Sequence, residues 1–217
     1  MTTSPAAVDN PPCTVLVVDD DSSLRDSLSS LLRSAGHQVR TFDSATQLLE
    51  APLPSGPCCL LLDVRLPGCG GFELQQRLAR AGAELPIIFM TGHGDIPMTV
   101  RAMKAGAVDF LPKPVGDQAL LAAVDAALET DRCRCQARQV EAERLHRYAL
   151  LSARERQVMH MAASGLMNKQ IASELGLSEI TVKIHRSRAM KKMAARTFAE
   201  LVLMAQGLEA ARSTTDR

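Results

Sequence analysis

Three carboxylates stand where two apolar runs of the chain end. Asp63 closes the run at 58–62, and Asp19 and Asp20 follow directly after the run at 14–18. Uninterrupted apolar runs of this length are typical of strands that are buried on both faces of a parallel sheet. Open α/β sheets bind their ligands at the carboxyl ends of such strands. If the two strands are neighbours, all three carboxylates lie in one crevice; the plainer alternative is that they only begin a turn and cap a helix.

Two more polar residues end apolar runs, and the five side chains together define a chemistry. Thr91 closes the run at 86–91, and Lys113 follows the run at 108–111. Three carboxylates a few ångströms apart repel one another and attract a divalent cation, and oxygen ligands suit Mg²⁺. Beside that metal Asp63 can attack a phosphoryl group, whose oxygens Lys113 and Thr91 can bind. The set predicts phosphoryl chemistry with Mg²⁺ as the cofactor, which makes the plainer alternative weak.

The elements that must position these residues alternate between strand and helix. Ser22 is the expected cap of the first helix and Gly36 its expected end. Such alternation predicts a parallel, three-layered sheet, and five units fit an α/β flavodoxin-like (βα)5 domain, from which the strand order 2-1-3-4-5 is adopted. The expected strands are 14–18, 38–42, 58–62, 86–91 and 108–111, and the later helices are 44–50, 71–80, 95–104 and 117–130.

Length, charge and cysteine content fit two modest domains. Residues 1–149 carry 14 Lys and Arg against 18 Asp and Glu (net −4), whereas 150–217 carry 11 against 6 (net +5). Only the second part is therefore suited to a polyanion.

The six cysteines lack disulfide or metal spacing and are expected to be reduced and mostly buried. Residues 1–12 predict a disordered tail, and the absence of a signal peptide or an apolar run of ~20 residues predicts a cytoplasmic protein without membrane contact.

Four segments of the first part resemble the receiver domain of two-component response regulators. They are Val17-Val18-Asp19-Asp20-Asp21, Asp63-Val64-Arg65-Leu66-Pro67 with Gly71, Met90-Thr91-Gly92-His93-Gly94, and the segment from Ala105 to Pro114. Their combined spacing is specific and covers about residues 13–130. The resemblance implies that a sensor histidine kinase phosphorylates Asp63. It further implies a Mg²⁺ site of Asp19, Asp20, Asp63 and the backbone carbonyl of Arg65, switch and phosphate-binding residues Thr91, Phe110 and Lys113, a cis Lys113–Pro114 bond, and an influence of Arg65 and His93 on phosphoryl loss.

An enzymatic alternative lacks one of its groups. Aspartate-nucleophile phosphatases of the haloacid dehalogenase type place a second acid two residues after the nucleophile, where it acts as general acid. That position holds Arg65 in this chain. The chain is therefore not expected to be an enzyme.

A helix without glycine or proline joins the two parts. Its apolar stripe continues to about Thr130, beyond which Arg, Glu and Gln dominate. Residues 131–149 therefore predict a helical linker. A sparse stripe of Cys135, Ala142 and Leu145 permits a weak coiled coil between two chains, and a solvated single helix is an equally open alternative.

The second part predicts short helices joined by tight turns. Ser152 and Glu155 have the spacing of a capping box. Asn168 and Ser178 are expected to cap two further helices, separated by a turn at Gly176. Two short helices joined by such a turn form a helix-turn-helix. The second carries a basic face suited to the major groove, and the alternative is a basic hairpin that binds protein.

This second part resembles the LuxR-type DNA-binding domain of NarL/FixJ regulators, and the likeness points to the FixJ branch. It rests on Leu151 to Glu155, Gly165 to Ala172 and Leu177 to His185. Lys183 and Ile184 would reach base edges, while residues nearer the DNA backbone are Thr181, His185, Arg186, Arg188 and Lys191. Ser187 stands where some relatives carry a base-reading lysine, so the operator is not implied. The domain is placed at 150–208, with a tail at 209–217, and its fourth helix, at 198–207, would form a dimer contact.

The sequence is therefore identified as a member of the NarL/FixJ family of two-component response regulators. The resemblance implies a transcription factor that is phosphorylated on Asp63, forms a homodimer, binds promoter DNA and activates transcription, with RNA polymerase as a further partner. Phosphorylation would reshape a face made of the helix at 96–105, the strand at 108–111 and the helix at 117–130. Two alternatives stay open: a DNA-binding regulator that does not depend on phosphorylation, and an adaptor whose second part binds protein.

Overall fold

The chain divides into two compact units, and the boundary between them in the sequence falls between Gln136 and Ala137. The computed structural model describes residues 13–92, 100 and 102–215, with side chains as far as Leu208. Each unit has apolar clusters of its own. Within the described ranges, no helix has both the length and the apolar character that crossing a membrane requires.

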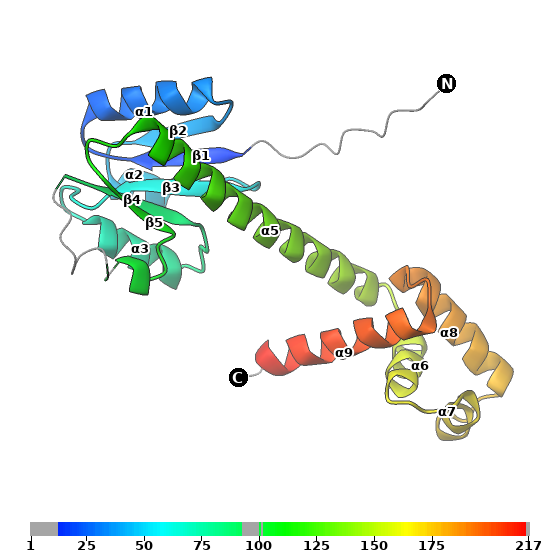
Figure 1. Cartoon of the computed structure of the whole chain (residues 1–217). Helices are drawn as coiled ribbons and strands as arrows, with labels where there is room; N and C mark the ends of the chain where they lie inside the picture. Colours follow the sequence, from blue (N-terminus) through cyan, green and yellow to red (C-terminus); the bar gives the residue numbers. More distant parts are fainter. Residues whose placement is uncertain (1–12, 93–99, 101, 216–217) are drawn as a thin grey trace, which may run out of the picture. The chain divides into compact units, whose positions relative to one another are not determined.

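A five-stranded parallel sheet forms the centre of the first unit (Figure 1). Its order is β2-β1-β3-β4-β5, which confirms the strand order adopted with the flavodoxin-like fold. Every residue of β1, β3 and β4 is buried, as expected for strands that are covered on both faces. The bounds are β1 Thr14–Val18, β2 Gln38–Phe42, β3 Cys58–Asp63, β4 Ile87–Thr91 and β5 Asp109–Pro112.

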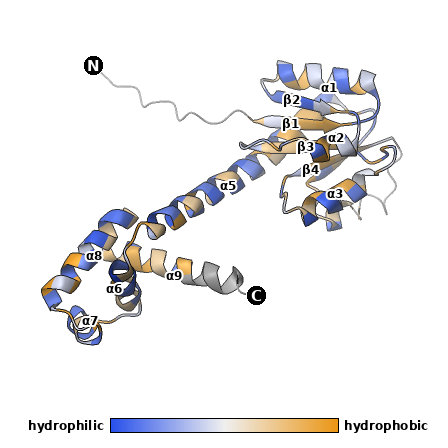
Figure 2. Ribbon diagram, turned by 180° about the vertical axis from the view of Figure 1, so that it is seen from behind, coloured by the Kyte–Doolittle hydropathy of each residue, from blue (hydrophilic) through white to orange (hydrophobic). Residues whose placement is uncertain are grey.

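Helices cover both faces of the sheet, because successive side chains of a strand point to opposite sides. Val15 and Val17 of β1 belong to the cluster formed with α1 and α5, whereas Leu16 and Val18 belong to the cluster formed with α2 and α3. Figure 2 shows the sheet as mainly hydrophobic and the surrounding helices as mixed. The helices of this unit with both ends inside the described residues are α1 Ser22–Ser34, α2 Ala45–Glu50, α3 Gly71–Arg80 and the first part of α5 Asp117–Ala149, and residues 102–104 are helical as well.

Some local expectations for this unit differ from the structure. Asp21, not Ser22, caps α1: its carboxylate accepts two backbone N–H groups of the first turn, at 2.9 and 3.2 Å. Asp provides the same cap as Ser, one residue earlier. The last strand, β5 Asp109–Pro112, begins and ends one residue later than expected. Most of the helix expected at 95–104 falls outside the described residues.

α5 is one continuous helix of 33 residues, and it stays attached to the first unit beyond the end of its apolar stripe. Asp131 is buried, and its Oδ2 accepts the N–H of Cys58 at 2.9 Å. The guanidinium of Arg134 donates to the carbonyl of Glu84 at 2.5 Å. These polar contacts explain why the first unit reaches Gln136.

The six cysteines, all of them in the described ranges, are less buried than expected. Burial raises the pKa of the Cys59 thiol, which keeps it protonated. The prediction that most of them are buried is wrong, because four lie outside the sheet, on loops or on α5. Cys58 and Cys59 are buried, Cys13, Cys69 and Cys135 are half-buried, and Cys133 is exposed.

Four helices follow α5 in the part of the second unit that the structure describes. The predicted capping box opens α6: Ser152 Oγ accepts the N–H of Glu155 at 3.3 Å, and the Glu155 carboxylate accepts the N–H of Ser152 at 2.8 Å. Ser178 caps α8, as expected. The helices are α6 Ala153–Ala163, α7 Asn168–Leu175, α8 Glu179–Met193 and α9 Phe198–Thr215.

Two boundaries in the second unit differ from the expectation. Asn168 is the first helical residue of α7, and Met167 occupies the cap position. The side chain of Gln170 accepts the N–H of Met167 at 2.8 Å, so a backbone donor at the start of α7 is satisfied without a polar cap. α9 continues to Thr215, past the expected end at residue 207.

Candidate functional sites

The carboxylates at the ends of β1 and β3 meet, because these strands are neighbours in the sheet. Carboxylate oxygens of Asp19, Asp20 and Asp63, the acidic cluster, lie within 4.8 Å of one another. Asp19 is fully buried and Asp63 is 7% exposed, whereas Asp20 is exposed. Three carboxylates this close are unfavourable unless cations compensate their charge.

The ammonium group of Lys113 places a positive charge in the acidic cluster. Its Nζ donates to Asp19 Oδ2 and to Asp63 Oδ2, at 2.6 Å each. Burial alone would lower the pKa of Lys113, but its bonds to the two carboxylates outweigh burial and raise the pKa. Burial also raises the pKa of Asp19, against the opposing effect of its bonds to Lys113 and to the Asp21 backbone. Lys113 therefore stays charged and bridges the ends of β1 and β3.

Backbone groups fix the same carboxylates. The N–H of Arg65 donates to Asp63 Oδ1 at 2.9 Å, and the N–H of Asp21 donates to Asp19 Oδ1 at 3.0 Å. The side chain of Arg65 is exposed. Gly71 begins α3 directly behind Asp63: a Cβ there would lie 2.5 Å from the Asp63 carbonyl oxygen. Only glycine allows this close approach between α3 and the end of β3.

Thr91 and Phe110 lie on the two strands beyond β3. Thr91 is buried, and its carbonyl accepts the N–H of Lys113 at 2.7 Å, which joins the ends of β4 and β5 beside the acidic cluster. Phe110 is half-buried, and its ring centroid lies 6.5 Å from that of a phenylalanine on β4. The Lys113–Pro114 bond is cis, as the resemblance implied. His93 is outside the described residues.

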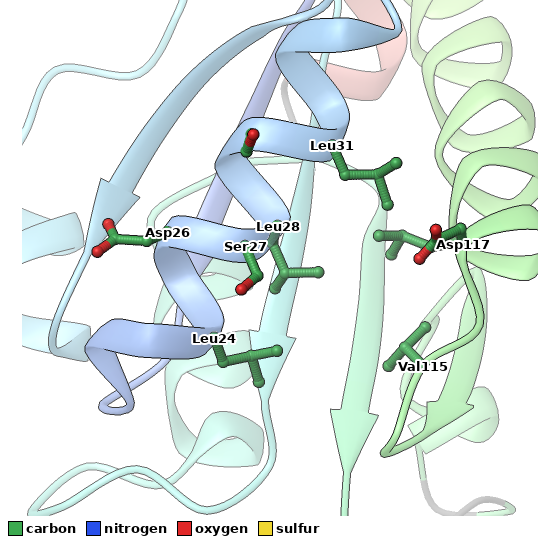
Figure 3. Close-up of a pocket in the computed structure, with 9 residues that line it drawn as sticks. Leu24, Asp26, Ser27, Leu28, Leu31, Val115 and Asp117 are labelled. Carbon is green, nitrogen blue, oxygen red and sulfur yellow. The ribbon is translucent and has the colours of Figure 1, made fainter.

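A pocket opens between α1 and the segment that leads into α5 (Figure 3). α1 begins just after Asp20, and Val115 follows Lys113 by two residues, so the pocket adjoins the acidic cluster along the chain. Its lining is about half apolar and half polar. The apolar side chains include Leu24, Leu28, Leu31 and Val115, and the polar ones are Asp26, Ser27, Ser30 and Asp117.

α8 has two different faces. Its buried residues pack in the apolar clusters of the second unit: Val182, Ala189 and Met193. Glu179 is the only carboxylate of the helix, so the side that faces solvent is basic. That side, the α8 face, consists of Ile180, Lys183, Ile184, Ser187, Arg188 and Lys191.

Some residues predicted to contact DNA are held within the second unit. Arg186 is half-buried: its Nη1 donates to Asn168 Oδ1 at 3.2 Å, and its guanidinium lies 4.5 Å from the ring centroid of Phe198. Thr181 and His185 are also half-buried. These contacts tie α8 to α7 and α9, and they set Arg186 apart from the cations that are fully available to a partner.

The predicted DNA contacts omit Ile180, which is 71% exposed in the first turn of α8. It precedes Lys183 by three residues and Ile184 by four, the spacing of one helix face. The signal that could have found it is this spacing, because an apolar β-branched residue by itself suggests the core.

Two family models match the chain in tandem. "Response regulator receiver domain" matches residues 15–125, and "Bacterial regulatory proteins, luxR family" matches residues 149–205. The chain is 54% identical over 203 residues to Nodulation protein W of Bradyrhizobium diazoefficiens, covering 94% of this chain and 89% of that protein. It is 48% identical over 193 residues to Transcriptional regulatory protein FixJ of Azorhizobium caulinodans, covering 88% and 90%. The solved structure of the response regulator StyR matches with a TM-score of 0.83 and 50% identity, over 90% of this chain and 99% of StyR.

These similarities extend over both units, and they agree with an acidic cluster in the first unit and a basic helix-turn-helix in the second. The matching families are regulatory and not families of enzymes. The chain belongs to the NarL/FixJ family of two-component response regulators, in which a receiver domain is joined to a LuxR-type DNA-binding domain that regulates transcription.

Proposed function

We propose that Asp63 accepts a phosphoryl group from the histidine of a sensor kinase and that this modification controls DNA binding by the second unit. The observation that carries the proposal is the position of Lys113, whose ammonium lies 2.6 Å from Asp63 Oδ2. A phosphoryl group brings about −1.5 to −2 charges at neutral pH. Lys113 is a cation that is already in place to bind the phosphoryl oxygens.

In the transfer, a carboxylate oxygen of Asp63 attacks the phosphorus atom. A P–O bond forms while the P–N bond to the kinase histidine breaks, and the electron pair of that bond returns to the imidazole nitrogen. The N–H of Arg65 and the ammonium of Lys113 each bond one oxygen of Asp63, so the carboxylate is oriented before its partner arrives.

The acidic cluster fits Mg²⁺, the ion that receiver domains bind at an acidic pocket. Asp19, Asp20 and Asp63 offer carboxylate oxygens only, and the exposure of Asp20 leaves room for water ligands. The backbone carbonyl of Arg65 would complete the protein ligands. When bound, the metal supplies positive charge that stabilises the phosphoryl oxygens.

The event at Asp63 reaches β4 and β5 through Thr91 and Lys113, whose backbones share a hydrogen bond. The Thr91 hydroxyl moves to donate to a phosphoryl oxygen, and Phe110, which is only half-buried, turns into the space that Thr91 leaves. The face formed by β5 and the first part of α5 changes its shape as a result, and the helix expected at 96–105 as the third part of that face lies mostly outside the described residues.

The kinase contacts the pocket beside α1. The apolar part of its lining suits the side chains of a partner helix, and the acidic cluster lies where the chain enters α1. Ser27 is exposed at this pocket, so Ser27→Arg should fill it without disturbing the core. We expect Ser27→Arg to lose phosphotransfer from the kinase and to keep phosphorylation by acetyl phosphate. Loss of both reactions would contradict this role of the pocket.

The α8 face binds promoter DNA. Lys183 and Ile184 reach base edges in the major groove, and Arg188 and Lys191 bind phosphates. Phosphorylation favours a homodimer, and two recognition helices then meet half-sites about one helical turn apart. Contact with RNA polymerase from this position activates transcription.

The experiment that tests the proposal is duplex binding with and without acetyl phosphate, by wild type and by Asp63→Asn. The donor should strengthen binding by wild type at least tenfold, because dimerisation makes the second half-site intramolecular, and it should not affect Asp63→Asn. Asp26→Asn, which changes an exposed carboxylate on α1, is the matched control and should behave like wild type. Equal binding in all conditions would support regulation without phosphorylation, and a lack of salt-dependent duplex binding would support a protein-binding adaptor.

A further inference from the structure

The α8 face combines cations with two exposed isoleucines. Ile180 is 71% exposed and Ile184 is 46% exposed. Since they are four residues apart, their side chains lie on one side of the helix, about 6 Å apart along its axis. Lys183 lies between them in the sequence, and Ser187 and Lys191 continue the same side.

The charge of the α8 face indicates what covers the isoleucines. Its ionisable residues are Lys183, Arg188 and Lys191, all of them basic, and Glu179, exposed at the start of the helix, is the only carboxylate of α8 beside them. An apolar protein surface would have to bury these cations, which is unfavourable. A DNA duplex binds the cations through its phosphates and offers an apolar group in the major groove, the C5-methyl of thymine.

We infer that Ile180 and Ile184 recognise the methyl groups of thymines in each half-site, one or two base pairs apart. The inference rests on the proposed function and adds to it a class of operator base. A separation of about 6 Å along the helix compares with a rise of about 3.4 Å per base pair. Ser187, the polar residue next on this side, carries a hydroxyl that bonds to several bases. Recognition of the thymines in each half-site therefore depends on the two isoleucines.

The test begins with a duplex selected from a random library by the full-length protein in the presence of acetyl phosphate. Each thymine of that duplex is then replaced singly by deoxyuridine, which lacks only the methyl group, and affinity is measured by fluorescence anisotropy. With wild type we expect about a fourfold loss at one or two positions per half-site, which corresponds to ~0.8 kcal/mol at 1.4 kcal/mol per tenfold change.

Two variants assign these losses to side chains. In Ile180→Ala the loss at one of the sensitive positions should disappear, and in Ile184→Ala the loss at the other. Both positions are exposed, so neither variant removes a core contact. Val140→Ala is the matched control, since Val140 is 69% exposed on α5, and it should keep the wild-type pattern.

The possible outcomes separate this inference from the proposed function. Enrichment of a duplex whose deoxyuridine pattern is the same in wild type and in Ile180→Ala would overturn the inference and leave the proposed function standing. If the protein enriches no duplex from the library, both the inference and the proposed DNA binding are contradicted. A sensitive thymine that Ile184→Ala alone makes insensitive would overturn the role of Ile180.

Discussion

Asp20→Asn should stabilise the first unit when Mg²⁺ is absent and weaken the response to Mg²⁺. Asp20 is the exposed member of the acidic cluster, and asparagine keeps its shape while it removes the charge. The variant therefore tests the electrostatics of the cluster with little change in packing.

The size of the effect follows from the charges around Asp20. Asp19 and Asp63 contribute two negative charges and Lys113 one positive charge, so the Asp20 carboxylate faces a net charge of −1 at roughly the 4.8 Å that spans the cluster. The repulsion is ~3.5 kcal/mol at an effective dielectric constant of about 20 and ~0.9 kcal/mol in water. Because Asp20 is exposed, the lower limit applies, and a gain of about 1 kcal/mol should raise the Tm of the first unit by about 4 °C.

Differential scanning calorimetry of the full-length protein measures both effects. In EDTA, Asp20→Asn should melt about 4 °C above wild type. Mg²⁺ at 100 times its Kd should stabilise wild type by about 2.7 kcal/mol, and the variant should need a much higher concentration for the same shift. Asp26→Asn should match wild type in both conditions. If Asp20→Asn has the wild-type Tm in EDTA and the wild-type response to Mg²⁺, the carboxylates do not act as one site.

Three further variants test other parts of the structure. Glu155→Gln removes the charge that bonds Lys192 Nζ at 2.7 Å, and because Lys192 is partly exposed we expect it to lower the free energy of unfolding by about 1–2 kcal/mol at pH 7. Burial would raise the pKa of Glu155, but its bonds to Lys192 and to the backbone hold that pKa below the ordinary value. The stabilisation by the Glu155 carboxylate is therefore lost as the pH falls through the lowered pKa. Denaturant titrations at pH 7 and pH 3 should show the free energies of unfolding of the two proteins converging at the lower pH. Arg186→Met should lower the free energy of unfolding by about 1 kcal/mol and leave the salt dependence of duplex binding unchanged, whereas a phosphate contact by Arg186 would reduce the salt slope by about 0.9. Gly71→Ala should destabilise the first unit by about 1–3 kcal/mol through the clash with the Asp63 carbonyl, and phosphorylation by acetyl phosphate should become slower.

The strand ends were predictable, because the interior residues of β1, β3 and β4 are apolar and a polar residue at their carboxyl ends lies at the edge of the sheet. Periodicity does not specify which strands are neighbours, and the order was adopted from the flavodoxin-like plan. Cap positions were also ambiguous, because Asp21 and Ser22 are both good caps and only the backbone geometry selects Asp21.

Exposed positions were less predictable than buried ones. Ile180 and Arg186 exchange the roles that their residue types suggest: the isoleucine is on the surface, and the arginine is half-buried against Phe198. Both follow from the packing of α8 against α6, α7 and α9, which bury the side next to Val182 whatever residues stand there. Residue type predicts exposure when a helix has one apolar stripe, and it fails at the margins of the stripe.

The end of the first unit shows why an apolar stripe does not define a domain boundary. The apolar stripe of α5 ends near Thr130, yet the carboxylate of Asp131 accepts a hydrogen bond from the backbone N–H of Cys58, the first residue of β3. An N–H buried at that position needs an acceptor, and a helix that ended at Thr130 would leave it without this one. Since β3 ends in Asp63, the same strand has the proposed phosphorylation site at its carboxyl end and the hydrogen bond to Asp131 of α5 at its amino end. The contact that fixes where α5 leaves the receiver is polar, so it is absent from a pattern that records only apolar residues.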